Sequence, residues 1–141
     1  MAVRGIALDT NAYVAFKQGE EEAVDILRHV PLIGISSVVL GELLAGFAAG
    51  TRETTNKREL ERFLASDRVQ LFPIDRVTAE HYATVYRKLR RKGHPIPTND
   101  MWLAATALQH GLAVFSYDEH LRAVDDLIAS TDLMAFVSQD V

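Results

Sequence analysis

Short apolar runs alternate with longer segments of helical periodicity along this chain. The runs Gly5-Ile6-Ala7-Leu8 and Leu112-Ala113-Val114-Phe115 are continuous, as in strands buried on both faces of a parallel sheet. The segments between such runs place apolar residues every three or four positions, which predicts amphipathic helices. We therefore expect an α/β fold with a mainly parallel central sheet and helices on both of its faces. The expected strands are residues 3–8, 32–35, 69–72, 112–115 and 133–137, and the expected helices are residues 11–17, 20–30, 36–49, 51–65, 77–92 and 98–110.

Residues at the expected helix ends support these boundaries. Ser36 and Ser37 are suitable N-caps for the helix that follows them, and Thr98 is suited to cap the helix after it. Gly93 and Gly111 each follow a predicted helix, and glycine commonly ends a helix because it adopts the left-handed conformation without strain.

The most apolar stretch, residues 30–50, is long enough to be considered as a membrane span. Pro31, Ser36, Ser37, Glu42 and four glycines interrupt it. A buried strand followed by a buried helix explains the stretch better, so we expect no association with a membrane.

The composition is that of a water-soluble globular protein. Of its 141 residues, 48% are hydrophobic and 24% are charged, and the length suits one domain spanning residues 1–141. The absence of cysteine excludes disulfides, thiolate metal sites and a thiol nucleophile. The N-terminus lacks the pattern of a secretory signal, so a cytoplasmic location is expected.

The net charge of −4 argues against binding nucleic acid through overall electrostatic attraction. Two segments are nevertheless basic: residues 87–92, and the group Arg52, Lys57, Arg58 and Arg62. Each fits either the solvated face of an amphipathic helix or a basic flank that contacts phosphate groups.

Four carboxylates stand alone inside apolar segments. Asp9 and Asp118 follow the two apolar runs described first, Glu42 lies in the stretch Val38–Phe47, and Asp100 begins the stretch Asn99–Leu108. Acidic side chains are rarely buried unless they are paired or bind a metal. Because the carboxyl ends of parallel strands share one edge of a sheet, we expect these four acids to converge there around a divalent cation.

Each acid also has a structural explanation. Asp9, Asp100 and Asp118 precede or open predicted helices, where a carboxylate can cap backbone N–H groups. Thr10 or Asn11 could cap the same helix as Asp9. Glu42 lies inside its helix, so its structural alternative is a buried acid paired with an arginine or a hydroxyl group.

The order and spacing of these motifs resemble those of the PIN-domain ribonucleases, and among them the VapC-type toxins of bacterial and archaeal toxin–antitoxin modules. The resemblance spans essentially the whole chain. The motifs that carry it are Leu8-Asp9-Thr10-Asn11, Gly41-Glu42-Leu43, Pro97-Thr98-Asn99-Asp100 with Trp102-Leu103-Ala104-Ala105, and Ser116-Tyr117-Asp118-Glu119-His120.

The resemblance implies a three-layer α/β/α sandwich and cleavage of RNA that depends on Mg²⁺ or Mn²⁺. It further implies homodimerisation and inhibition by a cognate antitoxin protein. Asp9, Asp100 and Asp118 match the family's acidic metal-binding positions, and Glu42 matches a further acid that holds metal directly or through water. Asn11 and Ser116 are expected to position these metal ligands, or a water molecule, without binding the metal themselves. His120 is expected to be a structural or rim histidine.

Two other functions compete with a nuclease. A haloacid-dehalogenase-type phosphatase also places an Asp after its first strand, but it requires a second Asp where this chain has Asn11. A non-catalytic interaction module is the other alternative, although binding alone does not require four acids. Dependence of RNA cleavage on magnesium or manganese distinguishes these possibilities.

Overall fold

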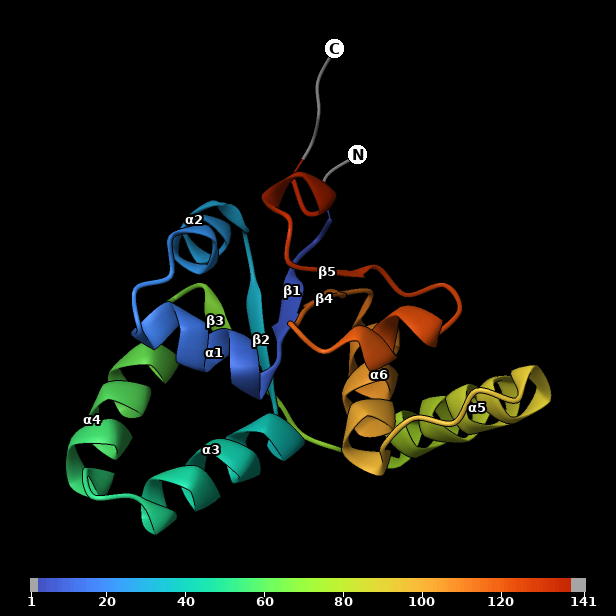
Figure 1. Ribbon diagram of the computed structural model, residues 1–141, viewed down its shortest axis with the longest axis horizontal. Helices are drawn as coiled ribbons and strands as arrows, with labels where there is room; N and C mark the ends of the chain where they lie inside the picture. The colour runs from blue at the N-terminus through green and yellow to red at the C-terminus, as the bar shows by residue number, and fades with distance from the viewer. Residues whose placement is uncertain (1–2, 138–141) are drawn as a thin grey trace.

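A five-stranded sheet runs through the centre of the molecule, and all of its strand pairs are parallel (Figure 1). This computed structural model describes residues 3–137 of the chain. The strands lie in the order β3-β2-β1-β4-β5. In chain order the elements are β1 (Ile6–Leu8), α1 (Thr10–Lys17), α2 (Glu21–His29), β2 (Ile33–Ser36), α3 (Ser37–Ala49), α4 (Glu53–Leu64), β3 (Val69–Phe72), α5 (Arg76–Lys92), α6 (Thr98–His110), β4 (Ala113–Phe115), the 3₁₀ helix η1 (Glu119–Ala123), β5 (Ala129–Ser130) and the 3₁₀ helix η2 (Leu133–Ala135).

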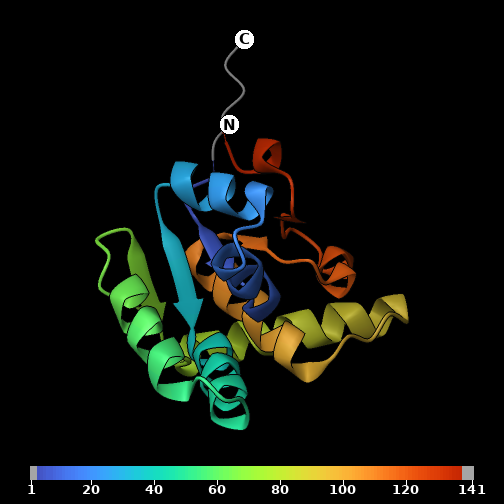
Figure 2. The same ribbon diagram turned by 60° about the vertical axis from the view of Figure 1, so that its left-hand side comes forward.

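Helices cover both faces of this sheet, so the expected three-layer arrangement is confirmed (Figures 1 and 2). Helices α1 and α2 pack together over one face. On the other face α6 packs against β1 and β4, and α5 packs against α6. Helices α3 and α4 form a pair in which α4 contacts β3 and α3 contacts α1.

The core explains why the central strands are continuous apolar runs. Every residue of β1 and β4 is buried, because helices cover both sides of these strands. Their register pairs Ile6 with Ala113 and Leu8 with Phe115, so the two strands end at the same level. The residues that follow them therefore lie side by side.

Several predicted helix ends are confirmed, and one is wrong. The Ser36 hydroxyl accepts a hydrogen bond from the Val39 amide at 3.2 Å, as an N-cap does. Gly93 and Gly111 end their helices with φ of 67° and 66°, which a residue with a side chain rarely adopts. Thr98 is not the cap of α6, because Pro97 holds that position and Thr98 is the first helical residue.

The predicted strand over residues 133–137 is wrong. The last strand is β5 at Ala129–Ser130, and the chain then turns into η2. The turn forms because the Asp132 amide donates to the Ser130 hydroxyl and the Asp132 carboxylate accepts from the Met134 amide. Phe136 is still buried, so this apolar segment contributes to the core without pairing as a strand.

The prediction that α3 is a buried helix is also wrong. Val39 and Leu43 are the buried residues of α3, while Leu44 is 37% exposed. None of the helices within residues 3–137 is long and apolar enough to cross a membrane.

Candidate active site

Asp9 and Ser116 directly follow two neighbouring strands and lie in contact. The Asp9 amide donates to the Phe115 carbonyl at 3.0 Å, which extends the β1–β4 pairing to the acid itself. One Asp9 carboxylate oxygen accepts from the Thr10 amide at 2.8 Å, and the other accepts from the Ser116 hydroxyl at 2.6 Å. Both side chains are buried, so Asp9 is held in one orientation.

The electrostatic environment of Asp9 disfavours its charged form. Burial raises the pKa of Asp9, although the hydrogen bonds from Ser116 and Thr10 act in the opposite direction. The negative charges of Glu42 and Asp118 also raise this pKa. Asp9 therefore belongs to a group of acids that repel one another.

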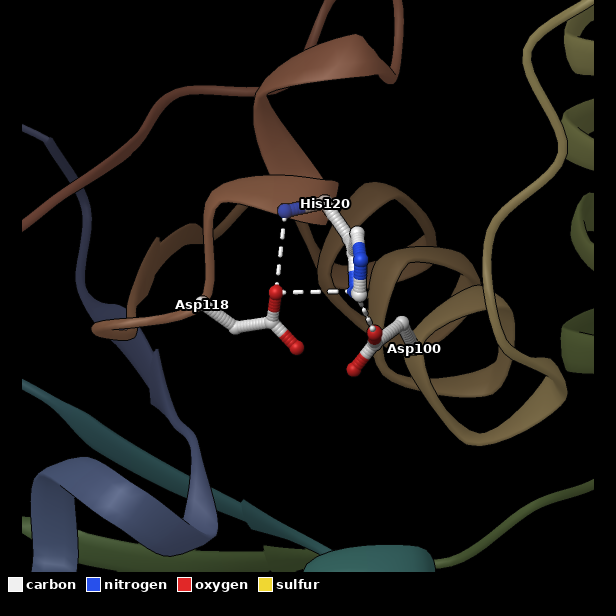
Figure 3. Close-up of side chains that lie close together, drawn as sticks. All are labelled: Asp100, Asp118 and His120. Carbon is white, nitrogen blue, oxygen red and sulfur yellow. Dashed lines mark hydrogen bonds and ion pairs between the residues drawn. The ribbon is translucent and has the colours of Figure 1, made fainter.

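Asp100 and Asp118 approach each other from α6 and from the loop after β4, with His120 between them (Figure 3). Asp100 is only 3% exposed, whereas the Asp118 side chain is 28% exposed. His120 Nδ1 lies 2.9 Å from Asp118 Oδ1 and 3.3 Å from Asp100 Oδ2. The Asp118 amide donates to the Ser116 hydroxyl at 2.9 Å, which joins this pair to Asp9.

The pKa values of this pair move in opposite directions. Burial and the neighbouring Asp118 carboxylate raise the pKa of Asp100 to about 6. Burial also acts to raise the pKa of Asp118, but hydrogen bonds from the His120 amide and from Asp100 outweigh it, so this pKa is lowered. Two carboxyl groups in contact cannot both ionise easily, so Asp100 keeps its proton to a higher pH than Asp118 does.

Glu42 reaches the same group of acids from α3. Its carboxylate accepts from the Thr10 hydroxyl at 2.8 Å and from the Asn99 side-chain amide at 3.1 Å. Thr10 adjoins Asp9 and Asn99 adjoins Asp100, so these hydrogen bonds join Glu42 to the residues next to both aspartates. Glu42 is half-buried, which contradicts the expectation that its apolar surroundings in the sequence bury it.

The capping alternative applies to some of these acids and not to others. Asp9 caps α1 and Asp118 caps η1, each through a backbone amide. Asp100 lies within α6 and is not its N-cap. A carboxylate that caps a helix through one lone pair still offers others to a cation, so capping does not remove Asp9 or Asp118 from the site.

The two predicted supporting residues lie around Asp9. The Asn11 side chain accepts from the Tyr117 amide at 3.0 Å and donates to the Ser116 hydroxyl at 3.5 Å. Ser116 donates in turn to Asp9, so Asn11 and Ser116 position that carboxylate.

Thr10, Asn99 and His120 contact the acids and were not predicted to do so. Thr10 and Asn99 each adjoin a predicted acid in the sequence, but their hydrogen bonds to Glu42 depend on how α3 is placed. The proximity of His120 to Asp118 in the sequence was a signal, because a 3₁₀ turn brings residues two apart onto one side.

The donor atoms of this site suit a divalent cation. One ligand atom each from Asp100, Asp118 and His120 lie within 4.8 Å of one another. Within residues 3–137, His120 is the only basic side chain within 4.0 Å of any of the four acids. The repulsion between these acids is thus not relieved by lysine or arginine, and oxygen donors are those that hard cations prefer.

Known proteins share sequence similarity with this chain. The family model of the PIN domain matches residues 6–127 of this chain. Ribonuclease VapC4 of Mycobacterium tuberculosis is 34% identical over 94 residues, which are 67% of this chain and 72% of that protein.

Two solved structures share the fold. A crystal structure of VapBC2 from Rickettsia felis bound to a promoter DNA fragment matches with a TM-score of 0.79 and 24% identity, over 89% of this chain and 96% of the other. A crystal structure of FitAcB from Neisseria gonorrhoeae matches with a TM-score of 0.73 and 27% identity, over 89% and 97% of the two chains.

Proposed function

This chain belongs to the PIN-domain family, and on that premise we propose that it is a metal-dependent endoribonuclease, the toxin of a toxin–antitoxin pair. The proposal takes residues 1–141 as one nuclease domain that acts on RNA in the cytoplasm. The observation that supports it most is the contact between Asp100 and Asp118, which Ser116 links to Asp9 through hydrogen bonds, with no lysine or arginine within 4.0 Å of these acids among residues 3–137.

The residues of the site fit Mg²⁺ or Mn²⁺. Asp9, Asp100 and Asp118 would hold the cation, and Glu42 would hold it directly or through water. A divalent cation supplies Lewis acidity, which stabilises negative charge on a phosphodiester group and lowers the pKa of water. Burial raises the pKa values of Asp9 and Asp100, and repulsion from neighbouring carboxylates adds to this effect; the positive charge of a cation would oppose both, in agreement with this assignment.

The chain itself supplies orientation. Ser116 and the Thr10 amide hold both oxygens of Asp9, and the β1–β4 pairing fixes the backbone beneath them. Asn11 keeps the loop after β4 in place through the Tyr117 amide. These fixed donors keep the Asp9 carboxylate and the loop after β4 from reorganising during the reaction. Preorganised sites accelerate hydrolysis in this way.

The nuclease proposal is tested with purified protein and single-stranded RNA. We expect cleavage when MgCl₂ or MnCl₂ is added and none when EDTA is in excess. Asp9→Asn, prepared in parallel, should be inactive, whereas Glu21→Gln on the far helix α2 should match the wild type. Equal cleavage by wild type and Asp9→Asn would point to a contaminating nuclease, and absence of cleavage with either metal would favour the interaction-module alternative.

The toxin role requires an inhibitor that covers the site. Two of the related solved structures are of VapBC2 and FitAcB, and VapBC2 is bound to a DNA fragment. In this chain a cavity of about 300 Å³ lies between α1, α3 and α4, and Tyr13, Val14, Lys17, Phe47 and Arg52 help to line it. An amphipathic antitoxin segment fits such a groove, with its apolar residues against Val14 and Phe47.

The toxin role is tested by expression in bacterial cells. The chain alone should stop growth, Asp9→Asn should relieve the arrest, and co-expression of the antitoxin should restore growth. Unimpaired growth with soluble wild-type protein would argue against the toxin role while leaving the nuclease activity open. We also propose that the toxin is a homodimer, which light scattering of the purified chain tests.

A further inference from the structure

His120 brings a nitrogen donor into a cluster of carboxylate oxygens. Its ring nitrogen Nδ1 faces the cluster, 2.9 Å from Asp118 and 3.3 Å from Asp100 (Figure 3). Its side chain is 54% exposed, so the rest of the ring reaches solvent. The backbone holds this arrangement, because the His120 amide donates to the same Asp118 oxygen at 2.9 Å.

These two spacings are those of direct contacts between the ring and the carboxylates, and they also match the spacing of neighbouring ligands on a single ion. Ligands at right angles around an ion are separated by √2 times the bond length, which is roughly 3.0–3.3 Å for bonds of about 2.1–2.3 Å. The distances from Nδ1 to the two carboxylate oxygens, 2.9 and 3.3 Å, fall close to that range. Little movement of His120 is therefore needed for it to share an ion with Asp100 and Asp118.

We propose that His120 is a ligand of the catalytic cation through Nδ1, and that this nitrogen makes the site prefer Mn²⁺ over Mg²⁺. The proposal rests on the proposed function, since it concerns the cation that the nuclease uses. Mg²⁺ takes oxygen ligands and retains its waters, whereas imidazole nitrogen is a ligand for transition ions. A mixed set of oxygen and nitrogen donors thus discriminates between two ions that an all-carboxylate site binds alike.

Ligation changes which nitrogen of His120 carries the proton. The neutral ring has one N–H, and a ligand nitrogen must present a lone pair. With Nδ1 on the cation, the neutral ring would carry its proton on Nε2, the nitrogen on the other side of the ring from the carboxylates. Without a cation, the same nitrogen would instead carry the proton and donate it to the carboxylates.

A different role for His120 makes the opposite prediction. If His120 only neutralises Asp100 and Asp118, it competes with a cation for the same oxygens, and its removal strengthens metal binding. If His120 is a ligand, its removal weakens the binding of Mn²⁺ more than that of Mg²⁺. The sign of the effect distinguishes the two roles.

The experiment measures the binding of each metal without RNA. Wild type, His120→Ala and His120→Asp are titrated with MnCl₂ by electron paramagnetic resonance, and with MgCl₂ by calorimetry. His94→Ala, which alters an exposed histidine in the loop before α6, is the matched control. Melting curves in EDTA verify that each variant is folded.

His120→Ala should raise the Kd for Mn²⁺ about tenfold or more and that for Mg²⁺ less than about threefold. Electron spin echo spectra of bound Mn²⁺ should show a directly coordinated ¹⁴N in wild type and His94→Ala, and lose it in His120→Ala. His120→Asp replaces the nitrogen donor with a charged oxygen donor, so it should bring the affinities for the two ions closer together.

Several outcomes would overturn the assignment. Unchanged or tighter Mn²⁺ binding by a folded His120→Ala would do so, as would a wild-type spectrum without coordinated nitrogen. Either result leaves the nuclease proposal standing if the wild type still binds the metal and cleaves RNA. A wild type that binds neither ion would overturn both proposals.

Discussion

Helices α6 and α3 are both 13 residues long and mostly apolar, and each carries one of the four acids. Their surroundings differ sharply. Helix α6 lies between the sheet and α5 and buries seven residues, whereas α3 packs near the end of the sheet and buries two (Figure 1). Asp100 on α6 is buried, while Glu42 on α3 is half-buried.

This difference shows what an apolar helix does and does not reveal. An apolar face predicts that something covers it, but the covering surface can belong to the same chain or to a partner. The face of α6 is covered by this chain's own sheet. The outer face of α3, with Leu44 exposed and Phe47 lining the cavity, is suited to a partner protein.

The largest expected effect lies on α6, at its acid. Asp100→Asn should reduce RNA cleavage on the order of a thousandfold, because under the proposed function it removes a charged ligand of the cation. The melting temperature in EDTA should be unchanged or higher, since the substitution relieves repulsion from Asp118. Initial rates and thermal melts measure both; a large loss of stability would make Asp100 a structural residue instead.

The next largest effect should be a loss of stability on substituting the buried face of α6. Leu103 is 1% exposed between the helix and the sheet. Leu103→Ala should lower the free energy of unfolding by about 3 kcal/mol, from lost burial and the cavity left behind. Urea unfolding curves measure this change. A loss below about 1 kcal/mol would show that α6 packs less tightly than its burial indicates.

In the metal-free protein, the dependence of folding stability on pH should also originate in α6. The pKa of Asp100 is raised to about 6 from 3.8, so between these values the folded state binds more protons than the unfolded state. Stability in EDTA should therefore fall as pH rises from about 4 to 6. We expect the free energy of unfolding to fall by about 1–2 kcal/mol over this range. This is less than an isolated shift of this size implies, because the Asp118 carboxyl group contacts Asp100 and the pKa of Asp118 is lowered.

Unfolding measured across this pH range in EDTA tests the assignment. Asp100→Asn should flatten the slope, and saturating Mn²⁺ should also remove it, because the cation favours the charged carboxylate. If the free energy of unfolding of Asp100→Asn still falls with pH, the pH dependence would be assigned to Asp9 instead, because burial raises the pKa of Asp9.

The same comparison shows how far the sequence predicts this molecule. The α/β order and the position of the acids follow from local patterns, because buried parallel strands are continuous apolar runs and their carboxyl ends share an edge. The exposure of α3 does not follow, because composition cannot reveal which surface covers a helix. The strand expected at residues 133–137 fails because the Asp132 carboxylate and the Ser130 hydroxyl form a turn that apolarity alone does not reveal.

Local sequence patterns predict the contacts among the site residues even less well. Glu42 meets Thr10 and Asn99 across 32 and 57 residues of chain, so these hydrogen bonds depend on the placement of three helices. The contact between His120 and Asp100 depends likewise on how η1 lies over the start of α6. Sequence motifs therefore locate the acids along the chain better than they predict the contacts that hold them.

The acid on α3 should matter less than the acid on α6. Glu42→Gln should lower the rate of RNA cleavage about tenfold, because Glu42 is half-buried and hydrogen-bonds to Thr10 and Asn99 at the margin of the site. Glutamine retains an oxygen that can accept one of these bonds, so the melting temperature should change little. A loss as large as that of Asp100→Asn would place Glu42 in direct contact with the cation.

The smallest expected effect is on the exposed face of α3. Leu44 is 37% exposed, so Leu44→Ala should change the free energy of unfolding by no more than about 0.5 kcal/mol, far less than the matched change at Leu103. The same substitution should weaken binding of the antitoxin, measured by calorimetry, because it reduces the apolar area that α3 exposes to a partner. If stability instead falls as much as in Leu103→Ala, and depends on protein concentration, a second copy of the chain covers α3, and the contrast between the two helices disappears in the dimer.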